Sequence, residues 1–234
     1  MIRRPPRSTQ GVSSAASDVY KRQDRVIFKN AFSDALDLDI CEAEIKDSLF
    51  DGSLNDGVDL ISTRNNKKKS NFRNNGDKGI SVGENSHLVG INNTLERNVI
   101  GVQSKDRSTA ILFNNSLIKN KIALSAYKKN WRYGDGGELF IGKSRIVGDE
   151  VTDVVDKHSF IQLFDSYLYS SDLEKTSHLD TFAVDSRTEF VASESQMFPK
   201  GNIGGTNLDN AIQTISKDLL DQVKSSIRGV TSGG

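Results

Sequence analysis

Three aspartates near the start of the chain are spaced so that they can share one surface. Asp37 and Asp39 alternate with two leucines in the run LDLD, and Asp59 follows Asp37 after a 22-residue interval. In an extended strand this alternation puts the leucines on one face and both aspartates on the other. If positions separated by this interval lie on adjacent strands, Asp59 stands beside Asp37 at about 4.8 Å. Carboxylates this close raise a pKa, bind a cation or attract a basic neighbour.

Other polar residues fall at the same two positions after further steps of the same interval. Ser81 and Gln103 extend the row begun by the aspartates, and Lys105 and Tyr127 fall in the column of Asp39. Together these side chains would give one face of a sheet both acidic and basic groups. A charged outer face is also the ordinary way for a sheet to stay soluble, so chemistry and simple solvation are both open.

The elements that would position these side chains are set by a 22-residue repeat. Small residues recur at this spacing, and each is followed by an apolar residue, in the pairs Ala35-Leu36, Gly57-Val58, Gly79-Ile80, Gly101-Val102 and Ala123-Leu124. A unit this short cannot enclose a core alone, so neighbouring units must stack into a solenoid. Alternation after each small residue predicts short strands, two or three per unit. The sequence therefore predicts an all-β fold, a parallel β-helix, and it lacks the signature of a leucine-rich repeat.

A second apolar position follows later in each unit. It is occupied by Phe50, Phe72, Leu95 and Leu117, and two residues before it stand Ser48, Ser70, Asn93 and Asn115. Three residues after it stand Asn75, Asn98 and Asn120. Asparagine tolerates the left-handed backbone of a tight corner, so we expect these three to have positive φ and to bond to one another along the stack.

The repeat units resemble a known family of solenoids. The runs that carry the resemblance are SDALDLDICEAEIKDSLF, NDGVDLIS, GDKGISVGENS, NVIGVQSKDRSTA and NKIALSAYKKNWRYG, within Asp24 to Asp172. They are similar to right-handed parallel β-helix proteins of the pectin-lyase-like superfamily, and above all to a group of predicted surface proteins without an assigned activity. The resemblance implies an extracellular or cell-surface module that binds carbohydrate.

The same resemblance implies an alternative, a calcium-dependent lyase acting on acidic polysaccharide. Lyases of this superfamily hold calcium with carboxylates and use a Lys or Arg to remove the proton beside the substrate carboxylate. The corresponding residues here would be Lys105 as catalytic base, Asp37, Asp39 and Asp59 as calcium ligands, and Ser81, Gln103, Tyr127 and Trp131 as substrate-binding residues. No arginine falls in the outward column, which departs from the lyase pattern.

The two ends of the chain follow other patterns. Residues 1–23 show no strand or helix period; they resemble translated sequencing adapter and are expected to be disordered, with an Arg-rich transit peptide as the alternative. We expect the β-helix over residues 24–172 and a mixed closing segment over 173–205. An apolar period of three and four predicts an amphipathic helix over 206–229, through Leu208, Ile212, Ile215, Leu219, Val223 and Ile227. It would cap the open end of the stack or join two copies of the chain.

The composition of the chain limits the kinds of partner that it is expected to bind. Lys and Arg total 31, as do Asp and Glu, so no global positive field would attract nucleic acid. No apolar run is long enough to span a membrane. The single cysteine, Cys41, is expected to be a small buried apolar side chain rather than a nucleophile. The basic run Lys67 to Lys69 is expected at an exposed edge or loop, or in contact with a polyanion.

Overall fold

The computed structural model describes residues 20–148, 151–169, 182–184 and 189–190, and the structural statements below concern these residues. The chain divides into two compact units, Met1–Met197 and Phe198–Gly234, and the described residues all belong to the first. The helix predicted over 206–229 lies outside the described residues, as does most of the closing segment.

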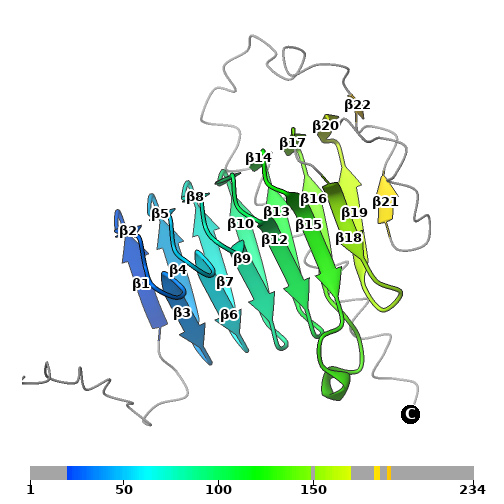
Figure 1. The fold of residues 1–234 in the computed structure, drawn as a ribbon. Helices are drawn as coiled ribbons and strands as arrows, with labels where there is room; N and C mark the ends of the chain where they lie inside the picture. Colours follow the sequence, from blue (N-terminus) through cyan, green and yellow to red (C-terminus); the bar gives the residue numbers. More distant parts are fainter. Residues whose placement is uncertain (1–19, 149–150, 170–181, 185–188, 191–234) are drawn as a thin grey trace, which may run out of the picture. The chain divides into compact units, whose positions relative to one another are not determined.

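Twenty-two strands form three parallel sheets (Figure 1). Sheet A contains, in order, β1 (Tyr20–Asp24), β4 (Glu42–Lys46), β7 (Arg64–Lys68), β10 (His87–Ile91), β13 (Thr109–Phe113), β16 (Glu138–Gly142), β19 (Phe160–Phe164) and β21 (Phe182–Val184). Sheet B contains β2 (Ile27–Lys29), β5 (Leu49–Asp51), β8 (Asn71–Arg73), β11 (Thr94–Glu96), β14 (Ser116–Ile118), β17 (Arg145–Val147), β20 (Tyr167–Tyr169) and β22 (Glu189–Phe190). Sheet C contains β3 (Leu36–Asp39), β6 (Val58–Ile61), β9 (Lys78–Gly83), β12 (Ile100–Lys105), β15 (Ile122–Tyr127) and β18 (Val151–Val155). A 3-10 helix spans Trp131–Tyr133.

The chain visits sheets A, B and C in turn, so each three-strand turn lies directly on the one before. The inward column of sheet C joins Leu36, Val58, Ile80, Val102 and Leu124 in register. All but Leu36 are fully buried, and the first turn leaves Leu36 partly covered. The predicted parallel β-solenoid and its 22-residue turn are therefore confirmed, with three strands in each turn.

The second predicted apolar column lies in sheet B. Phe50, Phe72, Leu95 and Leu117 are register partners and fully buried. At its start the rings of Phe28, Phe50 and Phe72 stack, with centroids 4.9 Å apart at each step. The interior is thus filled by like side chains repeating along the stack.

Glycine at the start of the sheet C strands allows the turns to approach closely. A Cβ atom on Gly57 would lie 2.6 Å from the carbonyl oxygen of Gly79, and one on Gly101 would lie 2.6 Å from that of Ala123. These contacts are shorter than a carbon and an oxygen tolerate. The recurring small residue is therefore required by the spacing of the backbone.

Buried side chains bond successive corners to each other. The side-chain amide of Asn75 donates to Oδ1 of Asn98 (2.8 Å), and that of Asn98 donates to Oδ1 of Asn120 (3.0 Å). Their backbones are not left-handed, because the positive φ belongs to the preceding residue, as in Arg97 (53°) and Lys119 (54°). The predicted ladder is confirmed, and the predicted left-handed asparagines are wrong by one position.

A second ladder runs through the corner between sheets A and B. The backbone N–H of each residue except the last donates to the side chain of the residue one turn on, in the order Ser48, Ser70, Asn93, Asn115, Ser144 and Ser166. These side chains are buried. Polar groups that would otherwise be unpaired in the interior are thereby satisfied.

Two boundaries and the burial of one lysine differ from the sequence-based expectation. The first strand, β1, begins at Tyr20, so four residues of the segment expected to be disordered lie in a strand. At the other end β21 and β22 pair with β19 and β20, so strand pairing continues beyond residue 172. Lys67 is fully buried within β7 rather than exposed at an edge, because it is the register partner of the inward-facing Ile45.

Candidate functional site

The outward face of sheet C carries a continuous line of polar side chains, which we call the polar row. Its members are successive register partners, in the order Asp37, Asp59, Ser81, Gln103 and Ser125. They alternate with the buried inward column of the same strands, so they lie on the opposite face. The arrangement predicted from the 22-residue spacing is therefore present.

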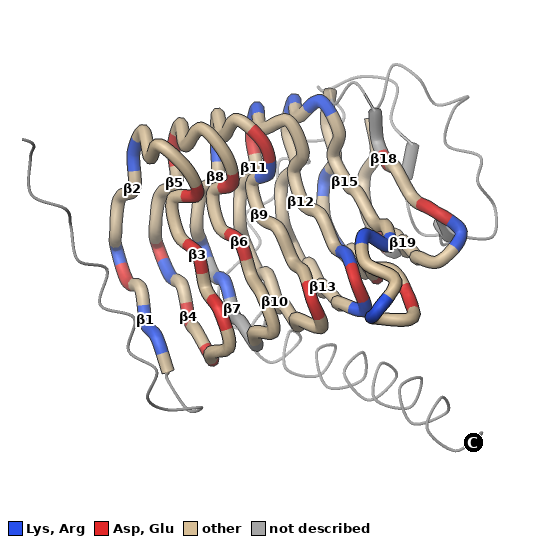
Figure 2. The backbone as a smooth tube through the Cα atoms, turned by 60° about the horizontal axis from the view of Figure 1, so that its bottom comes forward, with Lys and Arg blue, Asp and Glu red and all other residues tan. Residues whose placement is uncertain are grey.

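The first two strands make this face acidic (Figure 2). Asp37 and Asp39 of β3 are exposed, and Asp59 of β6 is half-buried. Burial raises the pKa of Asp37, and the nearby charges of Asp39 and Asp59 raise it further. No group of three or more His, Cys, Asp or Glu side chains in the described part of the chain is arranged to hold a metal ion. The calcium site therefore stays a prediction.

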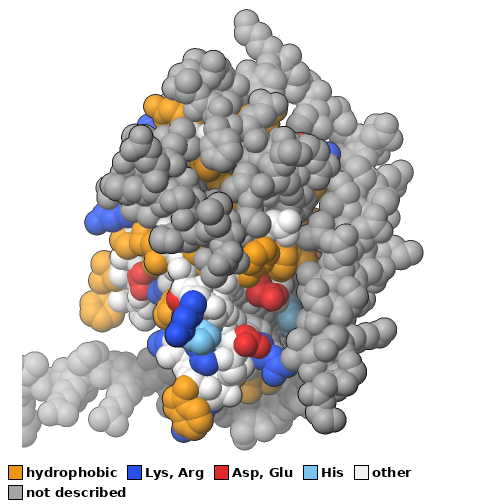
Figure 3. Space-filling model, turned by 90° about the vertical axis from the view of Figure 1, so that its right-hand side faces the viewer, with side chains coloured by type: hydrophobic (Ala, Val, Ile, Leu, Met, Phe, Trp, Pro, Cys, Tyr) orange, Lys and Arg blue, Asp and Glu red, His pale blue; other side chains and the backbone are white. Residues whose placement is uncertain are grey.

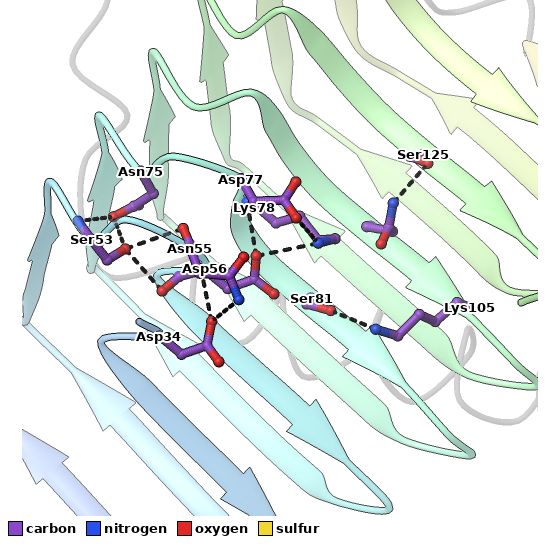
Figure 4. A network of polar contacts seen from close by, with 11 residues as sticks. Asp34, Ser53, Asn55, Asp56, Asn75, Asp77, Lys78, Ser81, Lys105 and Ser125 are labelled. Atoms are coloured by element: carbon purple, nitrogen blue, oxygen red, sulfur yellow. Dashed lines mark hydrogen bonds and ion pairs between the residues drawn. The ribbon is translucent and has the colours of Figure 1, made fainter. Parts of the chain in front are cut away.

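Lys105 reaches back along the sheet toward the acidic end. Its Nζ donates to Oγ of Ser81 at 3.3 Å (Figure 4). Ser81 lies on β9, which is one turn closer to Asp59 than β12, the strand that carries Lys105. The absence of a side chain at Gly83 leaves room for the Lys105 side chain, since a Cβ atom on Gly83 would lie 2.4 Å from Cε of Lys105. The missing side chain at Gly83 thus allows the ammonium group to lie over β9, which the sequence analysis did not foresee.

The middle of the polar row is buried rather than solvent-facing, contrary to the expectation for Ser81 and Gln103. Gln103 is only 4% exposed, and its Nε2 donates to Oγ of Ser125 at 3.3 Å. Its Oε1 has no hydrogen-bond partner, and neither has Oδ1 of Asp59. Two acceptor oxygens on this face are therefore shielded from solvent and without a hydrogen-bond partner, which is unusual because buried acceptors are normally paired.

A second polar network lies where the chain enters sheet C (Figure 4). Oδ1 of Asp34 accepts from the backbone N–H of Asp56 (2.8 Å), and Oδ1 of Asp56 accepts from that of Lys78 (3.0 Å). Burial raises the pKa of Asp56 to about 6, although the Lys78 ammonium lies 3.3 Å away. The 22-residue spacing of these three residues was the available signal, and sequence reasoning missed it.

Two aromatic residues predicted to bind substrate, Tyr127 and Trp131, lie at the end of β15 and in the loop after it. Tyr127 is the register partner of Lys105, and burial raises its pKa. Trp131 is 80% exposed on the 3-10 helix, with the Arg132 guanidinium 5.9 Å from its ring. Tyr133 donates its hydroxyl to Oε2 of Glu84 at 3.3 Å.

Two carboxylates hold the first part of this loop by its backbone. Oδ1 of Asp106 accepts from the backbone N–H groups of Lys129 (2.8 Å) and Asn130 (2.6 Å). Oδ2 of Asp156 accepts from the backbone N–H of Lys128 at 2.9 Å. The loop is therefore anchored at its base while Trp131 projects from it.

Surface charge elsewhere is mixed. In the described part of the face in Figure 3, basic and acidic side chains lie among neutral and hydrophobic ones. Within the described residues, no helix has the length and apolarity needed to cross a membrane. No family model, curated protein or solved structure matches this chain. Any assignment of function therefore depends on the chemistry of the site itself.

Proposed function

We propose that the protein is an extracellular or cell-surface module that binds carbohydrate through the outward face of sheet C. The solenoid would be a right-handed β-helix of the pectin-lyase-like type. Sugar hydroxyls both donate and accept hydrogen bonds, so a face that mixes carboxylate, amide, hydroxyl and ammonium groups is suited to them. The observation that carries the proposal is the polar row, in which the exposed Asp37 and the half-buried Asp59 continue in register into Ser81, Gln103 and Ser125.

Two further features support a long ligand. The polar row continues in register over five strands, so a linear ligand lying along the stack would meet a polar side chain at each turn. At its far end the exposed ring of Trp131 offers an apolar face on which a sugar ring can stack.

Direct binding to a panel of neutral and uronate polysaccharides, measured by calorimetry, tests the proposal. We expect Lys105→Met and Trp131→Ala each to weaken binding at least tenfold. The matched control is Lys119→Met, an exposed lysine at another corner, which should bind as the wild type does. The proposal fails if no polysaccharide binds, or if the control variant loses as much affinity as the other two.

The second candidate is a calcium-dependent lyase with Lys105 as base. It is favoured by the position of the Lys105 ammonium, which lies beside Ser81, the register partner of Asp59. The base would therefore lie one strand, about 4.8 Å, from the predicted calcium ligands rather than two.

An activity screen separates the two candidates. Uronate polymers incubated with protein and calcium should yield unsaturated products, and Lys105→Met and Asp59→Asn should abolish them. If the melting temperature does not rise with added calcium, the metal-dependent reaction is excluded while carbohydrate binding stands.

A further inference from the structure

One turn of the solenoid has an interior that does not match the others. The inward positions of sheet A are apolar or small on the strands before and after β7, with Ala43 and Ile45 on β4 and Leu88 and Gly90 on β10. In β7 the corresponding register positions hold Asn65 and Lys67. Lys67 is fully buried, and no partner accepts a hydrogen bond from its Nζ.

The groups that face the Lys67 amine do not neutralise it. From sheet B the ring of Phe72 lies 6.0 Å from Nζ, and the register partners on either side are Ile45 and Gly90. The charges of Asp59 on β6 and of Cys41 at the corner before β4 act on Lys67 through space, and neither side chain forms a hydrogen bond with the Lys67 Nζ. An unpaired ammonium in such a place is costly.

The pairing of β7 is also weakly fixed. All five residues of the strand, RNNKK, are polar, so a shift by one residue would exchange one polar set for another. In addition, the repeat is longer by one residue here, because Arg64 pairs with Glu42 on one side and with His87 on the other. Apolar burial therefore does less to hold β7 than to hold its neighbours.

We propose that β7 is a proton-operated opening point of the solenoid: when Lys67 takes up a proton, β7 separates from β4 and β10 while the later turns stay folded. Burial lowers the pKa of Lys67 to about 7, while Cys41 and Asp59 act in the opposite direction. Above about pH 7 the closed strand thus holds a neutral amine, whereas an opened strand exposes the amine to water, where it is charged below about pH 10.5. Opening is therefore favoured as the pH falls.

Hydrogen exchange of the full chain, labelled at pH 6, 7.5 and 9 and corrected for intrinsic rates, tests the proposal. The opening equilibrium of the 64–68 segment should fall about 100-fold from pH 6 to pH 9, because that is the ratio set by the two pKa values. The reference segment is β13, which should change less than threefold. Lys67→Met and Lys67→Leu should remove the pH dependence of the β7 segment, and Lys69→Met, at an exposed neighbouring lysine, should keep it.

Each other result overturns the proposal. A β7 segment without pH dependence shows that Lys67 does not gate it, and equal slopes in β7 and β13 show global rather than local opening. A slope that survives in Lys67→Met assigns the proton to another group. If neither the Met nor the Leu variant folds, the amine is needed for the closed state, which contradicts the proposal directly.

Discussion

Replacing Asn98 with alanine tests whether the buried asparagine ladder holds the turns together. Asn98 makes four hydrogen bonds through its side chain. Its Oδ1 accepts from the backbone N–H (3.1 Å) and the side-chain amide (2.8 Å) of Asn75. Its Nδ2 donates to Oδ1 of Asn120 (3.0 Å) and to the carbonyl oxygen of Phe72 (3.0 Å).

The expected cost follows from the groups that lose their partners. Truncation leaves two N–H donors of Asn75 unpaired in a buried site, while Oδ1 of Asn120 still accepts from the backbone N–H of residue 98. Each orphaned buried donor costs about 1–3 kcal/mol, so we expect a loss of about 4 kcal/mol. That is a large part of the stability of an ordinary domain.

Urea unfolding followed by circular dichroism measures this loss. The matched control is Asn71→Ala, because Asn71 is exposed on the outer side of β8 and its truncation should cost less than about 0.5 kcal/mol. A loss below about 1 kcal/mol for Asn98→Ala, or equal losses in the two variants, would refute the reasoning that the ladder stabilises the stack.

Three further predictions concern other positions. Because burial raises the pKa of Asp56 to about 6, the wild type should lose about 2.4 kcal/mol of stability relative to Asp56→Asn as pH rises from 4 to 8, since the folded protein keeps a proton that the unfolded chain releases near pH 3.8. Urea unfolding of both proteins at both pH values measures this difference, and an equal change in the two proteins would contradict it. Gly83→Leu should displace Lys105 from Ser81 and lower polysaccharide affinity at least tenfold, with the β-sheet circular dichroism unchanged; an unchanged affinity would contradict the role given to Gly83. Gly101→Ala should cost about 2 kcal/mol in thermal unfolding, because its Cβ would press on a backbone oxygen of the next turn; a neutral result would show that the turns can move apart.

The stack itself was predictable because each turn repeats the same inward residues. Val58, Ile80 and Val102 align as their spacing requires. The conformation of the corners was not predictable from residue preference. Positive φ falls on Arg97 rather than Asn98, because the asparagine has to point inward to join the ladder and the outward position is left to its neighbour.

The spacing predicted which residues of the candidate site lie side by side, but it did not predict where the Lys105 side chain extends. The spacing puts Ser81 beside Asp59, whereas the direction of the Lys105 side chain depends on the space left by Gly83. Lys67 is a second side chain whose surroundings could not be predicted from its residue type. A basic run is normally exposed, but the register of β7 gives Lys67 an inward position whatever its charge.

The anchored loop after β15 has a consequence for protein engineering. The turn that contains it is longer by seven residues, since Glu138 pairs with Thr109, yet the strands on both sides keep their alignment. The carboxylates of Asp106 and Asp156 accept hydrogen bonds from the backbone at the start of the loop. At its end the N–H of Gly136 donates to the carbonyl oxygen of His158 (2.9 Å). A foreign peptide grafted between Asn130 and Gly134 would therefore be displayed from a rigid scaffold, with its two ends already clamped.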